Sequence, residues 1–184
     1  MSQLHTVKLR AMEPEDLDLL YHIENDINIW HVGTNNVPYS RYTLHDYIAH
    51  ASGDIYTDKQ VRLMIENDHG ETVGIVDLVN FSPQHLRAEI GIVIKDCYRN
   101  LGYANAALQK IMAYAHDVLH LHQLYAIIET SNTVSISLFD SLGFSQTTHL
   151  KEWTYNGNAY MDAIVMQKFL TEATHVDGLI TSLK

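Results

Sequence analysis

A glycine turn in the middle of the chain has the residue types to bind a phosphate group. The segment 99–104 (RNLGYA) follows the β-branched run at residues 90–94 and precedes a stretch rich in helix-forming residues. Such a turn places the first amide N–H groups of a helix, and the positive end of its dipole, beside a bound anion. Gly102 lets the backbone approach the anion closely, and Ala104 keeps the first helical turn small. The pattern predicts a phosphate- or pyrophosphate-binding loop, although a glycine turn alone is often only a helix cap.

Carboxylate side chains near this loop could act as bases or bind a cation. Glu89 stands in the strand that precedes the loop, where a carboxylate can remove a proton directly or through water. The alternative is that Glu89 forms an ion pair with Arg87 or Arg99. The other carboxylates that could bind a cationic amine, or could equally be solvated surface charges, are Glu24, Asp26 and Asp77.

Histidine is abundant, with 12 in the chain, but its spacing gives little support for a metal site. His116, His120 and His122 include imidazoles four residues apart at the end of a predicted helix, a spacing that can hold zinc. No cysteine or glutamate lies close by in the sequence, so we expect no metal. A protonated histidine near a helix C-terminus is a sufficient explanation for this cluster.

The composition fits one folded domain. The 184 residues are 46% hydrophobic and 18% charged, which is typical of a globular protein that buries a substantial core. We expect residues 1–170 to form that domain and residues 171–184 to form a C-terminal tail. Cys97 is the only cysteine, so no disulfide can form within the chain.

Charge and hydropathy argue against two classes of partner. A formal net charge of −10 disfavours nucleic-acid binding, which needs a basic face, and is compatible with a cationic substrate. No apolar run approaches the roughly 20 residues of a membrane span, and the first residues lack the apolar core of a signal peptide. We therefore expect a cytoplasmic protein that binds neither nucleic acids nor membranes.

Hydrophobic periodicity and turn residues predict the elements that position these side chains. Strands are expected at residues 7–10, 60–66, 72–81, 86–94 and 124–128, with a final hairpin that turns at residues 156–158. Helices are expected at residues 12–23, 44–51 and 102–119 and after Asn132, and residues 25–40 form a loop that could carry specificity. This order predicts one α/β domain with a mixed sheet and helices on both faces.

Two motifs, found in order, resemble those of the GNAT superfamily of N-acetyltransferases. The loop at residues 99–104 resembles the acyl-CoA pyrophosphate loop of that superfamily. About thirty residues downstream, a strand is followed by Asn132, a helix and the Leu-Gly-Phe triplet at 142–144, which resembles its other recurring feature. The resemblance implies the GNAT fold, with a mostly antiparallel central sheet between helices.

The resemblance also implies how acetyl-CoA is held as co-substrate. The backbone of Ile92, Val93 and Ile94 would pair with the pantetheine arm like an added strand, and Asn132 would contact the pantetheine or the thioester end. The residues implied at the pyrophosphate are Arg99, Asn100, Leu101, Gly102, Tyr103, Ala104 and Asn105. The alternative is that residues 92–94 form only a core strand. The two interpretations are compatible, because the cofactor would pair with backbone groups while the side chains pack in the core.

One departure from the superfamily concerns the proton donor. In many members the residue seven positions after that asparagine is a tyrosine thought to protonate the departing CoA thiolate. Here it is Phe139, which cannot donate a proton. A positioned general acid contributes about 10²- to 10⁴-fold, so we expect slower or water-assisted transfer. Phe139 is then either part of the cofactor site or plain helix core.

Over residues 7–169 the chain is similar to the bacterial spermidine N-acetyltransferases. The similar segments are residues 7–10, 15–17, 87–89, 124–125 and 153–157. Those enzymes carry an acidic patch before the second helix that recognises polyamine, whereas this chain has the neutral sequence TNNVPY at residues 34–39.

The resemblance therefore predicts an acetyl-CoA-dependent N-acetyltransferase that acts on a primary amine, either a small amine or a polyamine. The alternatives are a protein N-terminal amine acetyltransferase and an acyl-CoA-binding module with little turnover. The resemblance also implies a homo-oligomer, without fixing the number of subunits.

Overall fold

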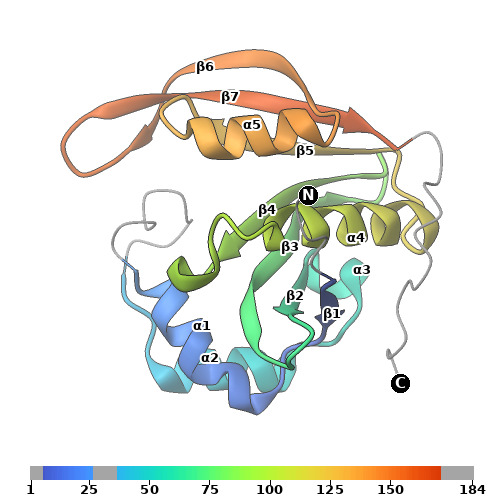
Figure 1. Ribbon diagram of the computed structural model, residues 1–184, viewed down its shortest axis with the longest axis vertical. Helices are drawn as coiled ribbons and strands as arrows, with labels where there is room; N and C mark the ends of the chain where they lie inside the picture. The colour runs from blue at the N-terminus through green and yellow to red at the C-terminus, as the bar shows by residue number, and fades with distance from the viewer. Residues whose placement is uncertain (1–5, 27–36, 171–184) are drawn as a thin grey trace.

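One twisted sheet carries the whole domain, and the computed structural model describes it over residues 6–26 and 37–170 (Figure 1). The strands are β1 (Lys8–Arg10), β2 (Val61–Glu66), β3 (Thr72–Ser82), β4 (Arg87–Ile94), β5 (Gln123–Glu129), β6 (Ser145–Tyr155) and β7 (Tyr160–Phe169). The helices are η1 (Pro14–Asp16), α1 (Leu17–Glu24), α2 (Arg41–His50), α3 (Ile55–Asp58), η3 (Asp96–Tyr98), α4 (Tyr103–Asp117) and α5 (Thr133–Ser141).

The seven strands lie in the order β1-β2-β3-β4-β5-β7-β6. In the described part of the chain β4 and β5 pair in parallel, and the other neighbouring strands pair antiparallel. This arrangement confirms the expected α/β class with a mixed, mostly antiparallel sheet. Helix α4 lies in the connection between the parallel strands β4 and β5.

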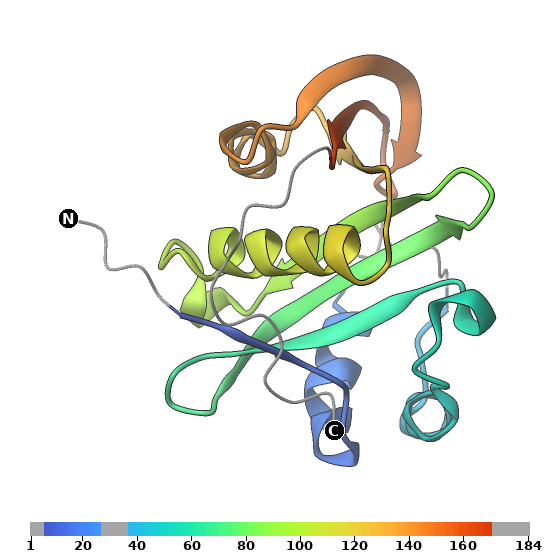
Figure 2. The ribbon, with the colours of Figure 1, turned by 90° about the vertical axis from the view of Figure 1, so that its right-hand side faces the viewer.

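Helices cover both faces of the sheet, as Figure 2 shows. On one face α4 and α5 close the larger core, to which β4 contributes Ala88, Ile90 and Ile94. On the other face α1 and α2 bury Leu20 and Leu44 against strands β2 and β3. We call this second surface the α1 face. Alternate residues of β4 therefore point to opposite faces of the sheet. Ala88, Ile90 and Ile94 pack in the larger core, whereas the odd-numbered residues between them point to the α1 face.

Gly74 allows β3 and β4 to approach each other closely. It lies opposite Ile94, and a Cβ added there would stand 2.3 Å from the carbonyl oxygen of Val93. No side chain fits at that distance. The glycine therefore fixes the position of the β4 end that leads into the loop at 99–104.

The expected elements are all present, with different boundaries at the first two helices. The first begins as a short 3-10 turn at Pro14 before α1, and the second begins earlier than expected, where the Ser40 hydroxyl accepts a hydrogen bond from the Thr43 N–H. The short α3 was not predicted. It is capped by Asp54, whose carboxylate accepts a hydrogen bond from the Tyr56 N–H. A single turn is too short to give a hydrophobic period.

Two expectations fall on parts of the chain that the structure does not describe. Residues 27–36, which include most of the expected specificity loop and the first half of the TNNVPY segment, lie outside the described residues, as does the expected tail at 171–184. The boundary of the domain at residue 170 stays a prediction. Among the described helices, none combines the length and the apolar character needed to cross a membrane.

Candidate active site

Strands β4 and β5 part soon after they begin to pair. They are in register over Arg87–Glu89 and Gln123–Tyr125, and Glu89 and Tyr125 form the last pair. Beyond this point β4 continues along β3, whereas β5 continues along β7. Residues 90–94 therefore have a strand on one side only within the described structure. We call the point where the two strands part the fork.

The backbone of β4 alternates between β3 and this open edge. The Lys95 N–H donates to the Val73 carbonyl at 2.9 Å, so residues in step with Lys95, among them Val93, direct their backbone groups towards β3. Ile92 and Ile94 direct theirs towards the open edge. Two of the three residues implied to pair with pantetheine thus offer backbone donors and acceptors there, whereas Val93 does not.

The loop at residues 99–104 has the geometry of an anion-binding turn. Asn100 and Gly102 both adopt the left-handed conformation, with φ of 61° and 87°. Gly102 caps α4, whose first backbone hydrogen bond runs from the Ala106 N–H to the Gly102 carbonyl at 3.2 Å. Amides at such a helix start have no partner within the helix and attract anions.

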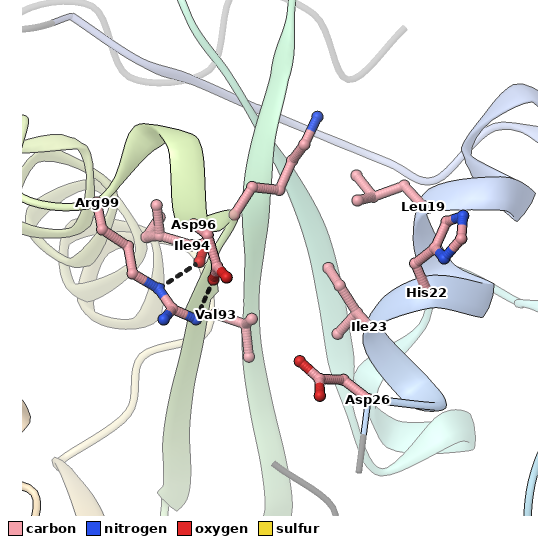
Figure 3. A pocket seen from close by; sticks show the side chains of 9 residues that line it. Leu19, His22, Ile23, Asp26, Val93, Ile94, Asp96 and Arg99 are labelled. Atoms are coloured by element: carbon pink, nitrogen blue, oxygen red, sulfur yellow. Dashed lines mark hydrogen bonds and ion pairs between the residues drawn. The ribbon is translucent and has the colours of Figure 1, made fainter. Parts of the chain in front are cut away.

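Arg99 joins this loop to the end of β4. Its Nε donates to the Ile94 carbonyl at 3.1 Å, and its guanidinium lies 2.8 Å from the Asp96 carboxylate (Figure 3). The side chain is about half exposed. The cation is therefore held beside the open edge of β4, with part of its surface available to an anion.

A pocket of about 440 Å³ adjoins Arg99 and reaches α1. Its walls are Leu19, His22, Ile23 and Asp26 on one side and Val93, Ile94, Lys95, Asp96 and Arg99 on the other (Figure 3). The structure thus places Asp26, expected as an amine-binding carboxylate, at the loop end of the site. Glu89, at the opposite end of β4, does not line this pocket.

Near the fork, the α1 face carries the polar groups of the site. Asp77 lies opposite Gly91, and Glu89, two residues before Gly91, lies opposite Tyr125, so all four positions share this face. A Cβ added to Gly91 would meet no atom within 4 Å. The glycine leaves an open space bordered by positions that carry two carboxylates and a phenol.

Glu89 is held by a polar side chain and not by a cation. Asn80 Nδ2 donates to its carboxylate at 2.8 Å, and its charge acts on the neighbouring phenol of Tyr125. Within the described residues no ion pair joins Glu89 to Arg87 or Arg99, so the alternative left open by the sequence is wrong in this structure. The carboxylate keeps its negative charge available at the fork.

Burial is the largest influence on Tyr125. Together with the negative charge of Glu89 it raises the pKa of the phenol above its ordinary value of 10.0. The phenol is therefore protonated at neutral pH and can donate a hydrogen bond.

Glu24 and Asp77 form ion pairs with Arg62. The Arg62 guanidinium donates from Nε and from a terminal nitrogen to the Asp77 carboxylate, at 2.9 and 2.8 Å, and it also contacts Glu24. Burial opposes the charge on Arg62, but the charges of Asp77 and Glu24 outweigh it and raise its pKa. Neither carboxylate is a solvated surface charge, so that alternative is wrong. One cation thus lies between two carboxylates.

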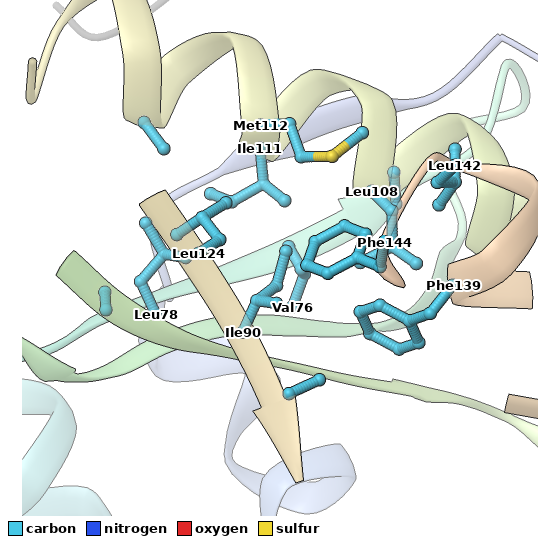
Figure 4. Close-up of a cluster of buried hydrophobic side chains, with 14 of the residues drawn as sticks. Val76, Leu78, Ile90, Leu108, Ile111, Met112, Leu124, Phe139, Leu142 and Phe144 are labelled. Carbon is cyan, nitrogen blue, oxygen red and sulfur yellow. The ribbon is translucent and has the colours of Figure 1, made fainter. Parts of the chain in front are cut away.

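The structure places Phe139 in the core. Its ring is 3% exposed and packs edge-to-face on Phe144, with ring centroids 5.0 Å apart (Figure 4). This position supports the helix-core interpretation, and a contact of Phe139 with the cofactor stays a prediction. Asn132 caps α5, where its side-chain oxygen accepts a hydrogen bond from the Ser135 N–H at 3.1 Å.

Sequence reasoning missed Arg62, Asn80, Gly91 and Tyr125. The alternation of β2, β3 and β4 could have placed Arg62 and Gly91 on one face with Asp77, but only if the register had been known. Asn80 reaches Glu89 because β3 bulges between Val79 and Ser82, and nothing in the sequence marks that bulge clearly.

No group of three histidine, cysteine or acidic side chains in the described ranges is arranged to hold a metal ion. His116 instead pairs with Asp117 at 2.7 Å, and the ring of His122 packs on Phe169. Cys97 is exposed.

Comparisons with known proteins agree with this geometry. A family model for the acetyltransferase (GNAT) domain matches residues 6–145. The spermidine N(1)-acetyltransferase of Escherichia coli K12 is 33% identical to this chain over 168 residues, which cover 90% of this chain and 87% of that protein.

Solved structures share the fold. The spermidine N-acetyltransferase from Vibrio cholerae in complex with CoA and spermine matches with a TM-score of 0.80 at 24% identity, covering 91% of this chain and 98% of that one. Another structure of the Vibrio cholerae spermidine/spermine enzyme, in complex with manganese ions, matches with a TM-score of 0.74 at 24% identity, covering 90% and 93%. These likenesses confirm the fold class expected from the sequence.

Proposed function

This chain belongs to the GNAT acetyltransferase family and is related to spermidine N-acetyltransferases, and we propose that it transfers the acetyl group of acetyl-CoA to a primary amine of a polyamine or another small amine. The observation that carries the proposal is the fork between β4 and β5, which leaves the edge of β4 open beside Glu89. A thioester and an amine can meet there only if one arrives along the edge and the other over the α1 face.

The residues that would hold acetyl-CoA lie along the open edge and at the start of α4. The outward backbone groups of Ile92 and Ile94 match the amides of pantetheine, which need hydrogen-bond partners. The amides of Tyr103, Ala104 and Asn105 and the guanidinium of Arg99 suit a pyrophosphate. When bound, this co-substrate supplies the activated acetyl group, and no metal is needed for its transfer.

The α1 face fits a cationic acceptor. Asp77 and Glu24 share the cation of Arg62, and Glu89 adds a carboxylate that pairs with no cation among the described residues. The open space at Gly91 adjoins them. An alkylammonium group is attracted to such a surface, and the neutral segment at residues 34–39 then matters less for recognition.

Direct transfer of the acetyl group needs a base, a hydrogen-bond donor to the oxyanion and a thiolate that departs readily as the leaving group. Glu89 accepts the proton that the amine loses as its nitrogen attacks the carbonyl carbon. A main-chain N–H near Ile92 is the donor for the oxyanion. A thiol has a pKa of about 8.5, so a thiolate already leaves readily.

The relatedness to bacterial acetyltransferases also favours a cytoplasmic homo-oligomer, in which the acceptor is a small molecule and not a nucleic acid or a membrane. The net charge of −10 supports the exclusion of nucleic acid.

The test is release of CoA thiol from acetyl-CoA with spermidine, spermine, simple diamines and short peptides with free N-termini. We expect turnover with a polyamine or diamine and a matching loss of activity in Glu89→Gln. Turnover with peptides alone would identify an N-terminal acetyltransferase. Acetyl-CoA that raises the Tm without turnover of any amine would identify a binding module and overturn the proposal.

A further inference from the structure

We propose that Tyr125 supplies the proton to the departing thiolate, a role for which Phe139 has no hydroxyl group. This inference rests on the proposed acetyl transfer and assigns one more group to it. It starts from the position of Tyr125 at the fork, where the open edge of β4 ends.

The register places Tyr125 next to the proposed base. Tyr125 and Glu89 are the last partners of the parallel pair, and their side chains share the α1 face. Acetyl-CoA held at Arg99 and along Ile94 and Ile92 would point its thioester towards this pair. Phe139, by contrast, packs on Phe144 within the core.

Tyr125 lies beside a hydrogen-bonded carboxylate. Asn80 donates to Glu89 at 2.8 Å, and Glu89 stands opposite Tyr125 in the parallel pair, where its charge acts on the phenol. Burial and the charge of Glu89 keep the phenol protonated. A phenol alone is a weaker acid than a thiol, so it protonates a thiolate efficiently only when a stronger acid replaces its proton at the same time. The carboxyl group of Glu89 is such an acid once it has taken a proton from the amine.

The proton balance then closes within the site. The acceptor first loses its ammonium proton to water. Its neutral nitrogen then forms a bond to the carbonyl carbon and loses one further proton to Glu89. The carbon–sulfur bond breaks, the electron pair goes to sulfur, and the Tyr125 hydroxyl gives its proton to the thiolate. Glu89 returns its proton to the phenolate. The products are the N-acetyl amine and the CoA thiol, and both side chains regain their first state.

The experiment compares Tyr125→Phe with the wild type, using the amine that the wild type turns over fastest. We expect kcat to fall about 10²-fold or more, while the KM for acetyl-CoA and the acetyl-CoA-induced rise in Tm change little. Tyr114→Phe is the matched control, because Tyr114 is another partly buried tyrosine, which belongs to α4 and packs against the larger core, on the opposite face of the sheet from Glu89. We expect it to keep the wild-type kcat.

A kcat of Tyr125→Phe within threefold of the wild type would overturn the inference and leave the proposed function intact. A wild type that turns over no amine would overturn both. A fall in kcat shared equally by Tyr114→Phe would mean that the loss is structural, and would also overturn it.

A second measurement does not depend on activity. In protein labelled with ¹³C at the tyrosine ring, Tyr125→Phe assigns the signal of Tyr125, and its titration gives the pKa of the phenol. We expect Glu89→Gln to lower this pKa, because the charge of Glu89 raises it. An unchanged titration would show that the two groups are not coupled and would overturn the relay.

Discussion

Arg62 and Asp77 face each other across β2 and β3 and form an ion pair through two hydrogen bonds, at 2.9 and 2.8 Å. The same guanidinium reaches Glu24 on α1 and stands 5.8 Å from the centre of the Tyr47 ring on α2. One side chain thus ties both helices of the α1 face to the sheet. The ion pairs that hold Glu24 and Asp77 in place therefore also hold the helical layer on the sheet.

Arg62→Met should destabilise the fold by about 3 kcal/mol, because it leaves two largely buried carboxylates without their cation. Urea unfolding at neutral pH measures this loss. Arg41→Met is the control, since its ion pair with Asp18 is exposed and should contribute less than about 1 kcal/mol. Equal losses for the two variants would contradict the assignment.

Gly74→Ala and Gly91→Ala should have opposite effects, although the two glycines lie in adjacent strands. The Cβ at Gly74 meets the Val93 carbonyl oxygen at 2.3 Å, whereas the Cβ at Gly91 meets nothing within 4 Å. We expect Gly74→Ala to cost about 1–3 kcal/mol through overpacking. Gly91→Ala should be neutral or stabilise by up to about 1 kcal/mol, because alanine restricts the unfolded chain. Urea midpoints test the pair, and a destabilised Gly91→Ala would show that the space at the fork is filled.

Ala104→Glu should weaken the binding of acetyl-CoA without loosening α4. A carboxylate in the first turn favours the helix, because it complements the dipole, but it repels a pyrophosphate at the same amides. We expect at least a tenfold rise in Kd, measured by calorimetry, with an unchanged Tm in the absence of ligand. Gln109→Glu adds the same charge at an exposed position of the same helix and should leave the Kd near that of the wild type. Similar affinities in the two variants would place the pyrophosphate elsewhere.

The motifs in the sequence predicted the turn at 99–104 and the order of helices and strands along the chain well, because local residue types decide both. Gly102 has the left-handed conformation that only glycine adopts freely, and it caps α4 as expected. The pairing of charged side chains on the α1 face could not be predicted from the sequence, because it depends on the register between strands. Whether Glu24 and Asp77 are free or paired is decided by Arg62, which lies 38 and 15 residues away from them in the sequence.

Stability should depend on pH through Asp16, which is buried and accepts two hydrogen bonds from Arg10. Burial would raise the pKa of Asp16, but the hydrogen bonds from Arg10 and the Glu13 N–H outweigh it and hold that pKa below 3.8. This stabilisation is complete above the ordinary pKa and is lost as the pH falls through the lower folded value. Asp16→Asn should cost about 1–3 kcal/mol at neutral pH, and the gap to the wild type should close below pH 4. A gap that stays constant down to pH 3 would contradict the ion pair, and the exposed Asp18→Asn serves as the control.

Phe139→Tyr tests whether the phenylalanine at this position limits the reaction. The ring is 3% exposed and packs on Phe144, so an added hydroxyl would be buried among apolar side chains. We expect a loss of about 1–3 kcal/mol in stability from the unsatisfied hydroxyl, and no gain in kcat, because Tyr125 already provides the proton.

The informative comparison for this position is Phe139→Tyr in the Tyr125→Phe background. If α5 can turn the new phenol towards the thiolate, the double variant recovers part of the lost kcat, and the two positions are then alternative sources of one proton. If kcat rises about tenfold in the single variant Phe139→Tyr, the wild type lacks an acid altogether. The phenol of Tyr125 would then have another purpose at the fork, such as holding Glu89 in the orientation that removes the proton from the amine.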